Sequence, residues 1–469
     1  MRPRVTQVSD LLSGEQAGGL RYGDGGKSSA GGDAGGNVSP AGSRDVDIKG
    51  FSVDTRTLQP GDLFFAMRGP NNDGNLYIEQ ALARGAAAVI AERAADGPVI
   101  VVPDTLQALQ QLAACLRSRW AGDVIGVTGS AGKTSTKDVI AALLATEMSV
   151  GKTAGNFNNH VGLPLSILKL PDLARVAVLE IGMNHAGEIR DLARIASPRI
   201  AVVTNVGYAH IEGFESIDDI AAAKRELVEA LPPDGVAVLN ADDRRVLEFR
   251  NVHGGRTITY GLSEPAEVRA TGVEYLADSA RFRVGATSFE TELTGRHGIL
   301  NILAGIAVAG LYGIPPERLP SAVRDLKPGK MRGERIRRNG MTILNDCYNS
   351  NPDAVRAMLD VLRDTPASRH IAVLGEMLEL GRWSESLHRS VGHYATESGI
   401  SVLVGIRGAA RKMVDAAIEA GLQSSAAFFF EDPAPAGDQL RLIARQGDAI
   451  LFKGSRGTRV EIALERFLS

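Results

Sequence analysis

The chain has 469 residues, and 52 Lys and Arg against 55 Asp and Glu give it a formal net charge of −3 at pH 7. A chain of this length is too long for one hydrophobic core and predicts about three domains. The near-balance of charges gives no electrostatic basis for nucleic acid or an anionic membrane as the main partner. Local features of the chain must therefore hold any anionic substrate.

The cysteines and the first residues indicate a compartment. Cys115 and Cys347 are the only cysteines, too few for a disulfide framework, and they form no CxxC metal pair, so a reducing compartment fits best. Asp10 and Glu15 interrupt any apolar core of a signal peptide, and no run approaches the roughly 18 apolar residues of a membrane helix. We expect a cytoplasmic monomer without membrane insertion.

The first domain is predicted to cover residues 1–121. Residues 18–46 are rich in Gly, Ser and Ala and nearly free of large apolar groups, which predicts a flexible surface insert. After this insert, short apolar runs alternate with helical patterns. The expected strands are 52–55, 62–67, 86–92 and 98–102, and the expected helices are 75–85 and 105–120.

Residues 122–326 are predicted to form a central ATP-binding domain and residues 327–469 a C-terminal Rossmann-like domain. In both, β-branched runs alternate with helical patterns, which predicts an α/β fold with parallel sheets covered on both faces. The expected central strands are 123–128, 176–181, 200–206 and 235–240, followed by an antiparallel excursion (264–294) and a helix (297–313). The expected C-terminal strands are 341–346, 370–375, 401–406, 426–430 and 448–453.

The strongest local signal is the string Thr-Gly-Ser-Ala-Gly-Lys-Thr (128–134) between a predicted strand and a predicted helix. Glycines let backbone N–H groups turn toward phosphate oxygens, and the helix N-terminus adds a favourable dipole. We expect Lys133 to reach the β- and γ-phosphates of ATP and Thr134 to hold Mg²⁺. A strict phosphate loop would have Gly at Val127, and the alternative is a tight turn of an α/β sheet. The remaining loop residues expected at ATP are Gly129, Ser130, Ala131 and Gly132.

Three polar residues follow in the central domain. Glu180 ends an apolar strand, where a carboxylate is well placed for Mg²⁺, although it could equally cap the next element. His210 follows another strand, and a lone His is more often a hydrogen-bonded structural residue. Lys224 lies in a helical pattern, which by itself indicates a surface charge or a neighbour of Glu226 two residues on. The residues alone leave these alternatives open.

The string at 128–134 resembles the Mur ligase family, and from there the resemblance extends over nearly the whole chain. It implies that His210 and Glu180 bind Mg²⁺ and that Lys224 is carbamylated and helps to hold metal. The pKa of a lysine near metals can be lowered, and its free amine can then react with CO₂. The resemblance also implies that Asn301 contacts adenine and that Arg332 touches the ATP phosphates. The catalytic residues that it implies are Lys133, His210, Lys224 and Arg332.

The same resemblance implies a UDP-substrate site in the first domain. Asp54-Thr55-Arg56 and Asp73-Gly74 look like the family's UDP-binding module, although Asn75 stands where a His often follows. Without the family, the first string could be a capped turn with a solvated Arg. The residues implied at the UDP-linked substrate are Ser52, Thr55, Arg56, Asp73, Asn156 and Asn159.

Three strings in the C-terminal domain resemble the branch of the family that adds D-alanyl-D-alanine. They are Asn-Asp-Cys-Tyr-Asn-Ser-Asn-Pro (345–352), Gly-Glu-Met-Leu-Glu-Leu-Gly (375–381) and Lys-Gly-Ser-Arg (453–456). Asn345 occupies a position that is often Asp in the family, and the DNPR-type motif of the third-residue ligase is absent. The resemblance implies that Asp346 contacts the ATP ribose. It implies the dipeptide site at Tyr348, Asn349, Lys453, Ser455 and Arg456.

The resemblance implies an ATP- and Mg²⁺-dependent ligase of peptidoglycan precursor synthesis, and hence of cell-wall biogenesis, shape and division. It would join D-alanyl-D-alanine to UDP-N-acetylmuramoyl-tripeptide through an acyl phosphate. The alternatives are the ligase that adds the third peptide residue, a folate polyglutamylating ligase, and an ATP-driven switch protein that makes no bond. A non-catalytic scaffold is disfavoured because Lys133, Thr134, Glu180, His210 and Lys224 are all present.

Overall fold

The computed structural model describes residues 3–12 and 46–469. The predicted Gly-rich insert (18–46) lies outside the described residues except for Val46. The described chain divides into two compact units, each of which combines separate stretches of sequence. The first unit contains 1–124, 151–179 and 191–197, and the second contains 125–150, 180–190 and 198–469.

The first unit contains a four-stranded sheet in the order β1-β2-β5-β6, in which all pairs are parallel. All four residues of β2 are buried, as expected for a parallel strand covered on both faces. One face packs on α2 through a cluster that includes Phe64, Ile78 and Val89. The elements are α1 (Val5–Leu12), β1 (Gly50–Ser52), β2 (Asp62–Phe65), β3 (Arg68–Gly69), β4 (Asn72–Asp73), η1 (Gly74–Tyr77), α2 (Ile78–Ala83), β5 (Ala88–Ala91), β6 (Val99–Val101), α3 (Thr105–Arg119), β8 (Val150–Lys152), α5 (Gly162–Leu168) and β9 (Val176–Glu180).

The prediction of a strand over 52–55 was wrong. The strand ends at Ser52, and the chain turns at Asp54, whose side chain accepts a hydrogen bond from the backbone N–H of Arg56 (2.9 Å). An aspartate that bonds two residues ahead stabilises a turn and competes with strand pairing.

The central sheet of the second unit runs β15-β14-β13-β12-β11-β10-β7. The pairs from β7 to β13 are parallel, and β13 to β15 are antiparallel, which confirms the excursion predicted for 264–294. The elements are β7 (Asp123–Thr128), α4 (Lys133–Leu144), β10 (Ile200–Val203), η2 (Ile211–Gly213), α7 (Ile217–Glu229), β11 (Val236–Asn240), α8 (Arg244–Glu248), η3 (Phe249–Asn251), β12 (Arg256–Gly261), β13 (Val268–Tyr275), β14 (Ala280–Val284), β15 (Thr287–Thr291), α9 (Gly295–Leu311), η4 (Pro316–Arg318) and α10 (Pro320–Arg324). The helix α6 (Glu188–Ala196) begins in the second unit and continues in the first.

The helix α9 is buried on most sides, which is why it has no polar face. It packs along α4, and Gly305 allows the close approach, because a Cβ there would lie 2.7 Å from Val139. This contact fixes α9 beside the helix that follows the phosphate loop.

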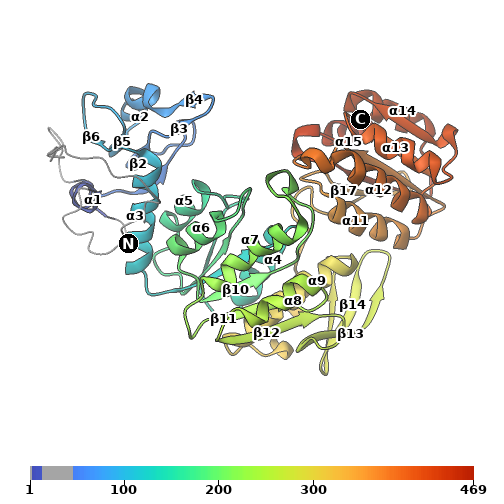
Figure 1. The fold of residues 1–469 in the computed structure, drawn as a ribbon, viewed down its shortest axis with the longest axis horizontal. Coiled ribbons are helices and arrows are strands. Elements are labelled where there is room, and N and C mark those ends of the chain that lie inside the picture. Colours follow the sequence, from blue (N-terminus) through green and yellow to red (C-terminus); the bar gives the residue numbers. More distant parts are fainter. Residues whose placement is uncertain (1–2, 13–45) are drawn as a thin grey trace. The chain divides into compact units, whose positions relative to one another are not determined.

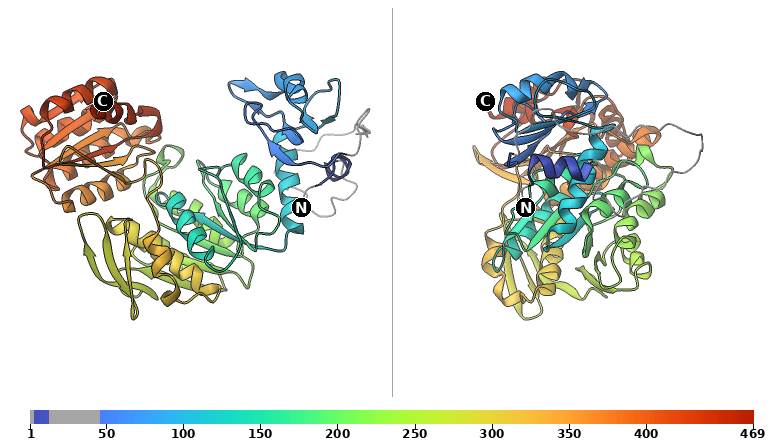
Figure 2. Two further views of the ribbon diagram at one scale, coloured as in Figure 1. Left: turned by 180° about the vertical axis from the view of Figure 1, so that it is seen from behind. Right: turned by 90° about the vertical axis from the view of Figure 1, so that its left-hand side faces the viewer.

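The C-terminal sheet of the second unit has the order β16-β17-β21-β18-β19-β20 and is parallel except for the β16-β17 hairpin. Helices cover both faces (Figures 1 and 2, orange to red), and α14 and α15 pack on the face that includes Ile343, Val404 and Phe452. The elements are β16 (Glu334–Arg338), β17 (Met341–Asp346), α11 (Pro352–Asp364), β18 (Arg369–Gly375), η5 (Gly381–Trp383), α12 (Ser384–Glu397), β19 (Val402–Ile406), α13 (Ala410–Glu419), η6 (Ser424–Ala426), β20 (Ala427–Phe430), α14 (Pro433–Ile443), β21 (Asp448–Lys453), η7 (Arg456–Thr458) and α15 (Glu461–Leu468).

The structure confirms the α/β class with parallel sheets. In the part of the chain that the structure describes, no helix has the length and apolar character needed to cross a membrane.

Candidate active site

The phosphate loop joins β7 to α4 and requires glycine at two positions. Gly129 has φ +151°, and a Cβ there would lie 1.8 Å from Oγ1 of Thr204. Gly132 has φ +80° and precedes the first residue of α4. Both conformations are costly for a residue with a Cβ. The loop therefore keeps the geometry in which backbone N–H groups can face an anion.

The end of β10 holds this loop in place. The Asn205 side chain accepts a hydrogen bond from the N–H of Ala131 (2.8 Å) and donates one to the carbonyl of Ala131 (3.0 Å). Thr204 Oγ1 also donates to that carbonyl, at 2.6 Å. Ser130 Oγ donates to the carbonyl of Gly207 (2.9 Å). The sequence indicated the loop but not Asn205, whose role depends on two parallel strands ending side by side.

Lys133 begins α4, and its Nζ donates a hydrogen bond to the carbonyl of Gly129 (2.7 Å). Burial lowers the pKa of Lys133, and the positive charge of Arg332 adds to this effect. The carboxylates of Glu180 and Glu379 act in the opposite direction. Charged residues from both the central and the C-terminal domains thus influence the pKa of Lys133.

Thr134 and Glu180 are in direct contact. Thr134 Oγ1 donates a hydrogen bond to Oε2 of Glu180 at 2.7 Å. Glu180 is the last residue of β9, belongs to the second unit like Thr134, and is only 2% exposed. Two residues further along α4, Thr136 Oγ1 donates to Oδ1 of the buried Asn301 on α9 (2.9 Å). The amide of Asn301 is therefore oriented beside the phosphate loop.

His210 lies in the loop after β10 and contacts Glu379, which follows β18. Its Nδ1 lies 2.6 Å from Oε2 of Glu379, although the ring N–H is poorly aligned with that oxygen. This contact is the main reason that the pKa of Glu379 is lowered. The N–H of Glu212 donates to the carbonyl of Glu379 (3.1 Å). Glu379 belongs to the string 375–381, but nothing local in that string indicated its contact with His210.

Lys224 on α7 is 1% exposed. Burial lowers its pKa well below the usual value, and the nearby positive charge of Lys133 adds to the shift. The expectation of a surface charge from the helical pattern alone was therefore wrong, because α7 turns Lys224 inward. Within residues 3–12 and 46–469, no three or more His, Cys, Asp or Glu side chains form a group suited to a metal ion. A metal site here thus needs Thr134 or a modified Lys224 as well.

Asp346 and Lys453 are paired at the carboxyl ends of β17 and β21. Lys453 Nζ donates to Oδ2 of Asp346 (2.5 Å) and to the carbonyl of Asn349 (2.9 Å), and Lys453 is 2% exposed. Ser455 Oγ donates to the carbonyl of Ser350 at 3.4 Å. The structure thus brings together the strings 345–352 and 453–456, which lie about a hundred residues apart.

Arg332 and Arg456 have different surroundings. The guanidinium of Arg332 lies over the ring of Tyr348, 3.7 Å from the ring centroid. Such stacking orients an arginine while leaving its N–H groups available at the edge. Arg456 is exposed and pairs with Glu461 (2.9 Å).

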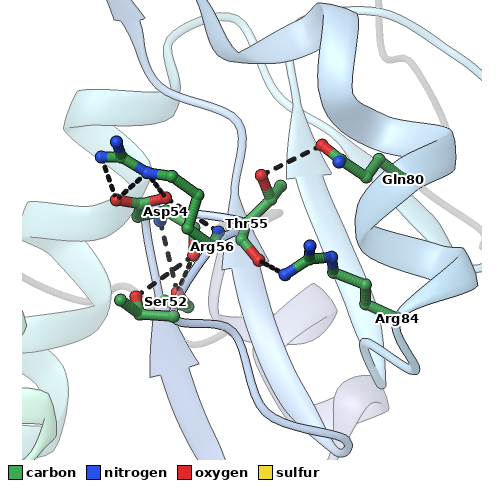
Figure 3. A network of polar contacts seen from close by, with 7 residues as sticks. Ser52, Asp54, Thr55, Arg56, Gln80 and Arg84 are labelled. Atoms are coloured by element: carbon green, nitrogen blue, oxygen red, sulfur yellow. Dashed lines mark hydrogen bonds and ion pairs between the residues drawn. The ribbon is translucent and has the colours of Figure 1, made fainter.

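The residues predicted to bind the UDP-linked substrate all lie in the first unit. Figure 3 shows the turn after β1, where Asp54 holds the guanidinium of the exposed Arg56 through contacts of 2.7–3.1 Å. Ser52 Oγ donates to the carbonyl of Asp54, and Thr55 Oγ1 donates to Oε1 of Gln80 (3.1 Å). The turn is thus preorganised by its own side chains.

The other predicted UDP-site residues are arranged less uniformly. Asp73 caps η1 by accepting the N–H of Asn75 (2.9 Å), and the Asn75 side chain is buried and accepts the N–H of Glu92. Asn156 and Asn159 are both exposed, and the Asn159 side chain accepts the N–H of Gly162, the first residue of α5 (2.8 Å). No hydrogen bond in the described chain joins Asn156 or Asn159 to Asp73.

Three parts of the chain match domains of one family. Residues 47–115 match the Mur ligase family, catalytic domain; residues 127–309 match the Mur ligase middle domain; and residues 331–456 match the Mur ligase, glutamate ligase domain. The matches follow one another in the three-domain order predicted from the sequence.

Individual proteins agree with this match. The chain is 36% identical to the UDP-N-acetylmuramoyl-tripeptide--D-alanyl-D-alanine ligase of Bacillus subtilis, over 88% of this chain and 92% of that protein. A crystal structure of MurF from Acinetobacter baumannii superposes with a TM-score of 0.84 at 30% identity and covers 91% of this chain and 95% of its own. The MurF ligase of Thermotoga maritima in complex with ADP gives 0.80 at 29% identity, with 90% and 97% covered. This chain belongs to the Mur ligase family.

Proposed function

We propose that this chain is an ATP-dependent ligase that joins D-alanyl-D-alanine to UDP-N-acetylmuramoyl-tripeptide in the cytoplasmic synthesis of peptidoglycan precursors. The proposal rests on the surroundings of Lys133. This residue lies on a phosphate loop whose Thr134 contacts Glu180, and the charges of Glu180 and Arg332 both influence its pKa. Its relatives are named for this reaction or contain ADP. We further propose a monomer with domains at 1–121, 122–326 and 327–469.

ATP is proposed to bind across the central and C-terminal domains. The loop 129–134 receives the phosphates, with Lys133 on the transferring group, and Asn301 faces adenine from α9. Arg332, held on Tyr348, reaches the phosphates, and Asp346 binds the ribose. A guanidinium directed at a transferring phosphoryl group stabilises charge that develops in the transition state.

The residues around Thr134 suit a Mg²⁺ ion. The Thr134 hydroxyl and Glu180 carboxylate are hard oxygen donors already in contact, and His210 adds a ring nitrogen. Bound Mg²⁺ would neutralise the charge of the phosphoryl group. We propose Thr134, Glu180, His210 and carbamylated Lys224 as the residues that hold it.

Carbamylation of Lys224 is chemically favoured by its surroundings. The free amine is the form that reacts with CO₂, and burial lowers the pKa of Lys224 toward that form. The amine nitrogen bonds to the carbon of CO₂ and loses a proton, which leaves a carboxylate on the side chain. The product places an anion near the positive charge of Lys133, whereas a protonated Lys224 would be repelled by that charge.

The proposed reaction has two steps. An oxygen of the tripeptide's terminal carboxylate bonds to the γ-phosphorus of ATP while the bridging bond breaks and ADP leaves. The amine of D-alanyl-D-alanine then attacks the acyl carbon, phosphate leaves with the electrons of the broken C–O bond, and the nitrogen loses a proton. Residues 345–352 and 453–456 are proposed to exclude water, which would hydrolyse the acyl phosphate.

The two peptide substrates are assigned to separate sets of residues. We propose that Tyr348, Asn349, Lys453, Ser455 and Arg456 bind the dipeptide, whose carboxylate suits a basic turn. The UDP-linked substrate is assigned to Ser52, Thr55, Arg56, Asp73, Asn156 and Asn159. The buried Asn75 side chain donates to Asp73 and accepts from the N–H of Glu92, which supports a structural role at a position where relatives often have His.

An ADP-release assay tests the function. We expect ADP to form at a substantial rate only when ATP, UDP-tripeptide and D-alanyl-D-alanine are all present. Preference for UDP-dipeptide with a free diamino acid would assign the third-residue ligase instead, and use of folate with glutamate would assign the folate enzyme. Slow ADP release that ignores every acceptor would indicate an ATP switch protein.

The contact between His210 and Glu379 gives a further prediction. A carboxylate that orients a metal-binding His usually contributes about 10- to 100-fold to metal affinity. We expect Glu379→Ala to raise the Mg²⁺ concentration for half-maximal activity by about that factor, and Glu379→Gln to have a smaller effect because it keeps an acceptor. Mn²⁺ binding, followed by electron paramagnetic resonance with an ATP analogue, measures the affinity directly. Equal Mn²⁺ affinities in all three proteins would contradict the prediction.

A further inference from the structure

The N-terminus of α11 contacts the loop that carries His210. Oδ2 of Asp353 accepts a hydrogen bond from the backbone N–H of Tyr208 at 2.9 Å. Asp353 follows the string 345–352, and Tyr208 lies two residues before His210. The bond therefore joins the C-terminal sheet to the central sheet at a single backbone amide.

The same loop is tied to the phosphate loop on its other side. The N–H of Gly207 donates to Oγ of Ser130 (2.8 Å), and that Oγ donates to the carbonyl of Gly207 (2.9 Å). Gly207 and Tyr208 thus form a two-residue bridge between Ser130 in the phosphate loop and Asp353 on α11.

A side chain at position 207 would collide with Asp353, which occupies the space beside Gly207. A Cβ at Gly207 would lie 2.2 Å from Oδ2, 2.9 Å from Cγ and 3.5 Å from Cβ of Asp353, and these are its three nearest neighbours. The backbone of Gly207 is not in the left-handed region, so its conformation does not itself require glycine. An alanine at 207 therefore conflicts with Asp353 and with no closer group.

Two further contacts join the loop after β10 to residues that follow β18 in the C-terminal sheet. The N–H of Glu212 donates to the carbonyl of Glu379 (3.1 Å), and Arg382 pairs with Glu215 (2.5 Å). Residues 205–215, which we call the docking segment, thus meet the C-terminal sheet at more than one point.

An aspartate in the first turn of a helix also has a local explanation. It is favoured by the helix dipole, and Arg356 lies 3.6 Å from Oδ1 of Asp353. This explanation accounts for the residue type but not for the bond of Oδ2 to Tyr208 or for the tight fit against Gly207.

We propose that Asp353 is a positioning residue for the ligase reaction. By binding the docking segment, it sets the C-terminal sheet relative to the phosphate loop, and Gly207 transmits that position to Ser130. The proposal rests on the proposed function. Asp353 does not touch the reacting atoms, and it acts through the placement of the residues that do.

The test is a double-mutant cycle of Gly207→Ala and Asp353→Ala. We expect Gly207→Ala to lower kcat on the order of 100-fold, because misplacement by about 1 Å can have that effect. Asp353→Ala loses one charge-assisted hydrogen bond and should lower kcat about tenfold. The double variant should match Asp353→Ala, since truncation removes the two atoms closest to the new methyl group. Asp364→Asn, at the exposed other end of α11, is the matched control and should leave kcat unchanged.

Binding of a fluorescent ATP analogue and thermal unfolding complete the test. A positioning role predicts that the affinity for the analogue falls less than kcat in each variant, because the bonds from Asn205 and Thr204 still hold the phosphate loop. Additive effects in the double variant, or an unaffected Gly207→Ala, would overturn the proposal. If Gly207→Ala also lowers the melting temperature, restoration of that temperature by Asp353→Ala supports the contact without reference to catalysis. Failure of the proposed function would appear separately, as a wild-type enzyme with no dipeptide-dependent ADP release.

Discussion

Replacement of Lys133 by methionine is expected to lower kcat about 100- to 1,000-fold, the usual result of removing one preorganised group that stabilises transition-state charge. Methionine keeps the length and much of the apolar stem of lysine but carries no charge. The substitution also removes the hydrogen bond from Nζ of Lys133 to the carbonyl of Gly129. The measurement is steady-state ADP release with saturating ATP, UDP-tripeptide and D-alanyl-D-alanine.

The control is Lys327→Met, which removes an exposed lysine paired with Glu292. Exposed ion pairs contribute little to stability, so this variant should retain wild-type kcat and melting temperature. Because Lys133 is proposed to act on the transferring phosphoryl group, the loss in Lys133→Met should appear mainly in kcat. A variant with normal kcat and only a raised KM for ATP would contradict this role and leave Lys133 as a binding residue.

Replacement of Lys224 by methionine is expected to abolish most activity while it stabilises the fold. Loss of a metal-holding group removes several kcal/mol of charge stabilisation, which at about 1.36 kcal/mol per tenfold corresponds to a loss on the order of 1,000-fold in kcat. In protein free of CO₂ and Mg²⁺, the same change removes a buried amine and its repulsion from Lys133. We therefore expect the melting temperature to rise by a few degrees.

The pH dependence of this stabilisation follows from the lowered pKa of Lys224. Below the usual value of 10.5 the unfolded chain carries a proton on Lys224, which the folded protein holds only with difficulty. The stability of the unmodified wild type should therefore increase as the pH rises toward 10.5, and the advantage of Lys224→Met should shrink. Thermal unfolding at several pH values measures this difference. A lower melting temperature for the variant at every pH would assign Lys224 a structural role.

Formation of the carbamate can be observed directly. Wild-type protein in ¹³C-bicarbonate should show a carbamate carbon signal in NMR that is absent from Lys224→Met. A spectrum without this signal, in an active enzyme, would exclude the modification while leaving Lys224 available as an amine.

Most strands and the phosphate loop were predictable because their signals are local. The runs at 123–128, 341–346 and 448–453 form strands over those residues, since consecutive apolar residues suit a sheet covered on both faces. The strand β16 was not predicted, because Glu-Arg-Ile-Arg-Arg has few apolar residues and pairs only at the sheet edge. Its pairing with β17 depends on the hairpin rather than on burial.

The candidate site likewise contains residues that a local sequence signal predicted and residues that no local signal indicated. The string 128–134 predicted a loop whose glycine requirements the structure explains residue by residue. Asn205, Glu379 and Asp353 were not singled out, because each acts on a partner at least 74 residues away in sequence. The order of the parallel strands brings Asn205 beside the phosphate loop, whereas Glu379 and Asp353 reach their partners where the C-terminal domain contacts the loop after β10. The roles assigned to the site residues remain predictions for the experiments above.

If Lys133 binds the γ-phosphate as proposed, its hydrogen bond to the carbonyl of Gly129 competes with that phosphate. An incoming triphosphate must displace a backbone oxygen from the ammonium group, and a strongly anionic γ-phosphate is well suited to do so. After transfer, the remaining diphosphate offers Lys133 less negative charge, and the carbonyl can reclaim it. In this proposed role, the hydrogen bond to Gly129 would favour exchange of spent nucleotide for fresh, and the same lysine would contribute to turnover after the chemistry is complete.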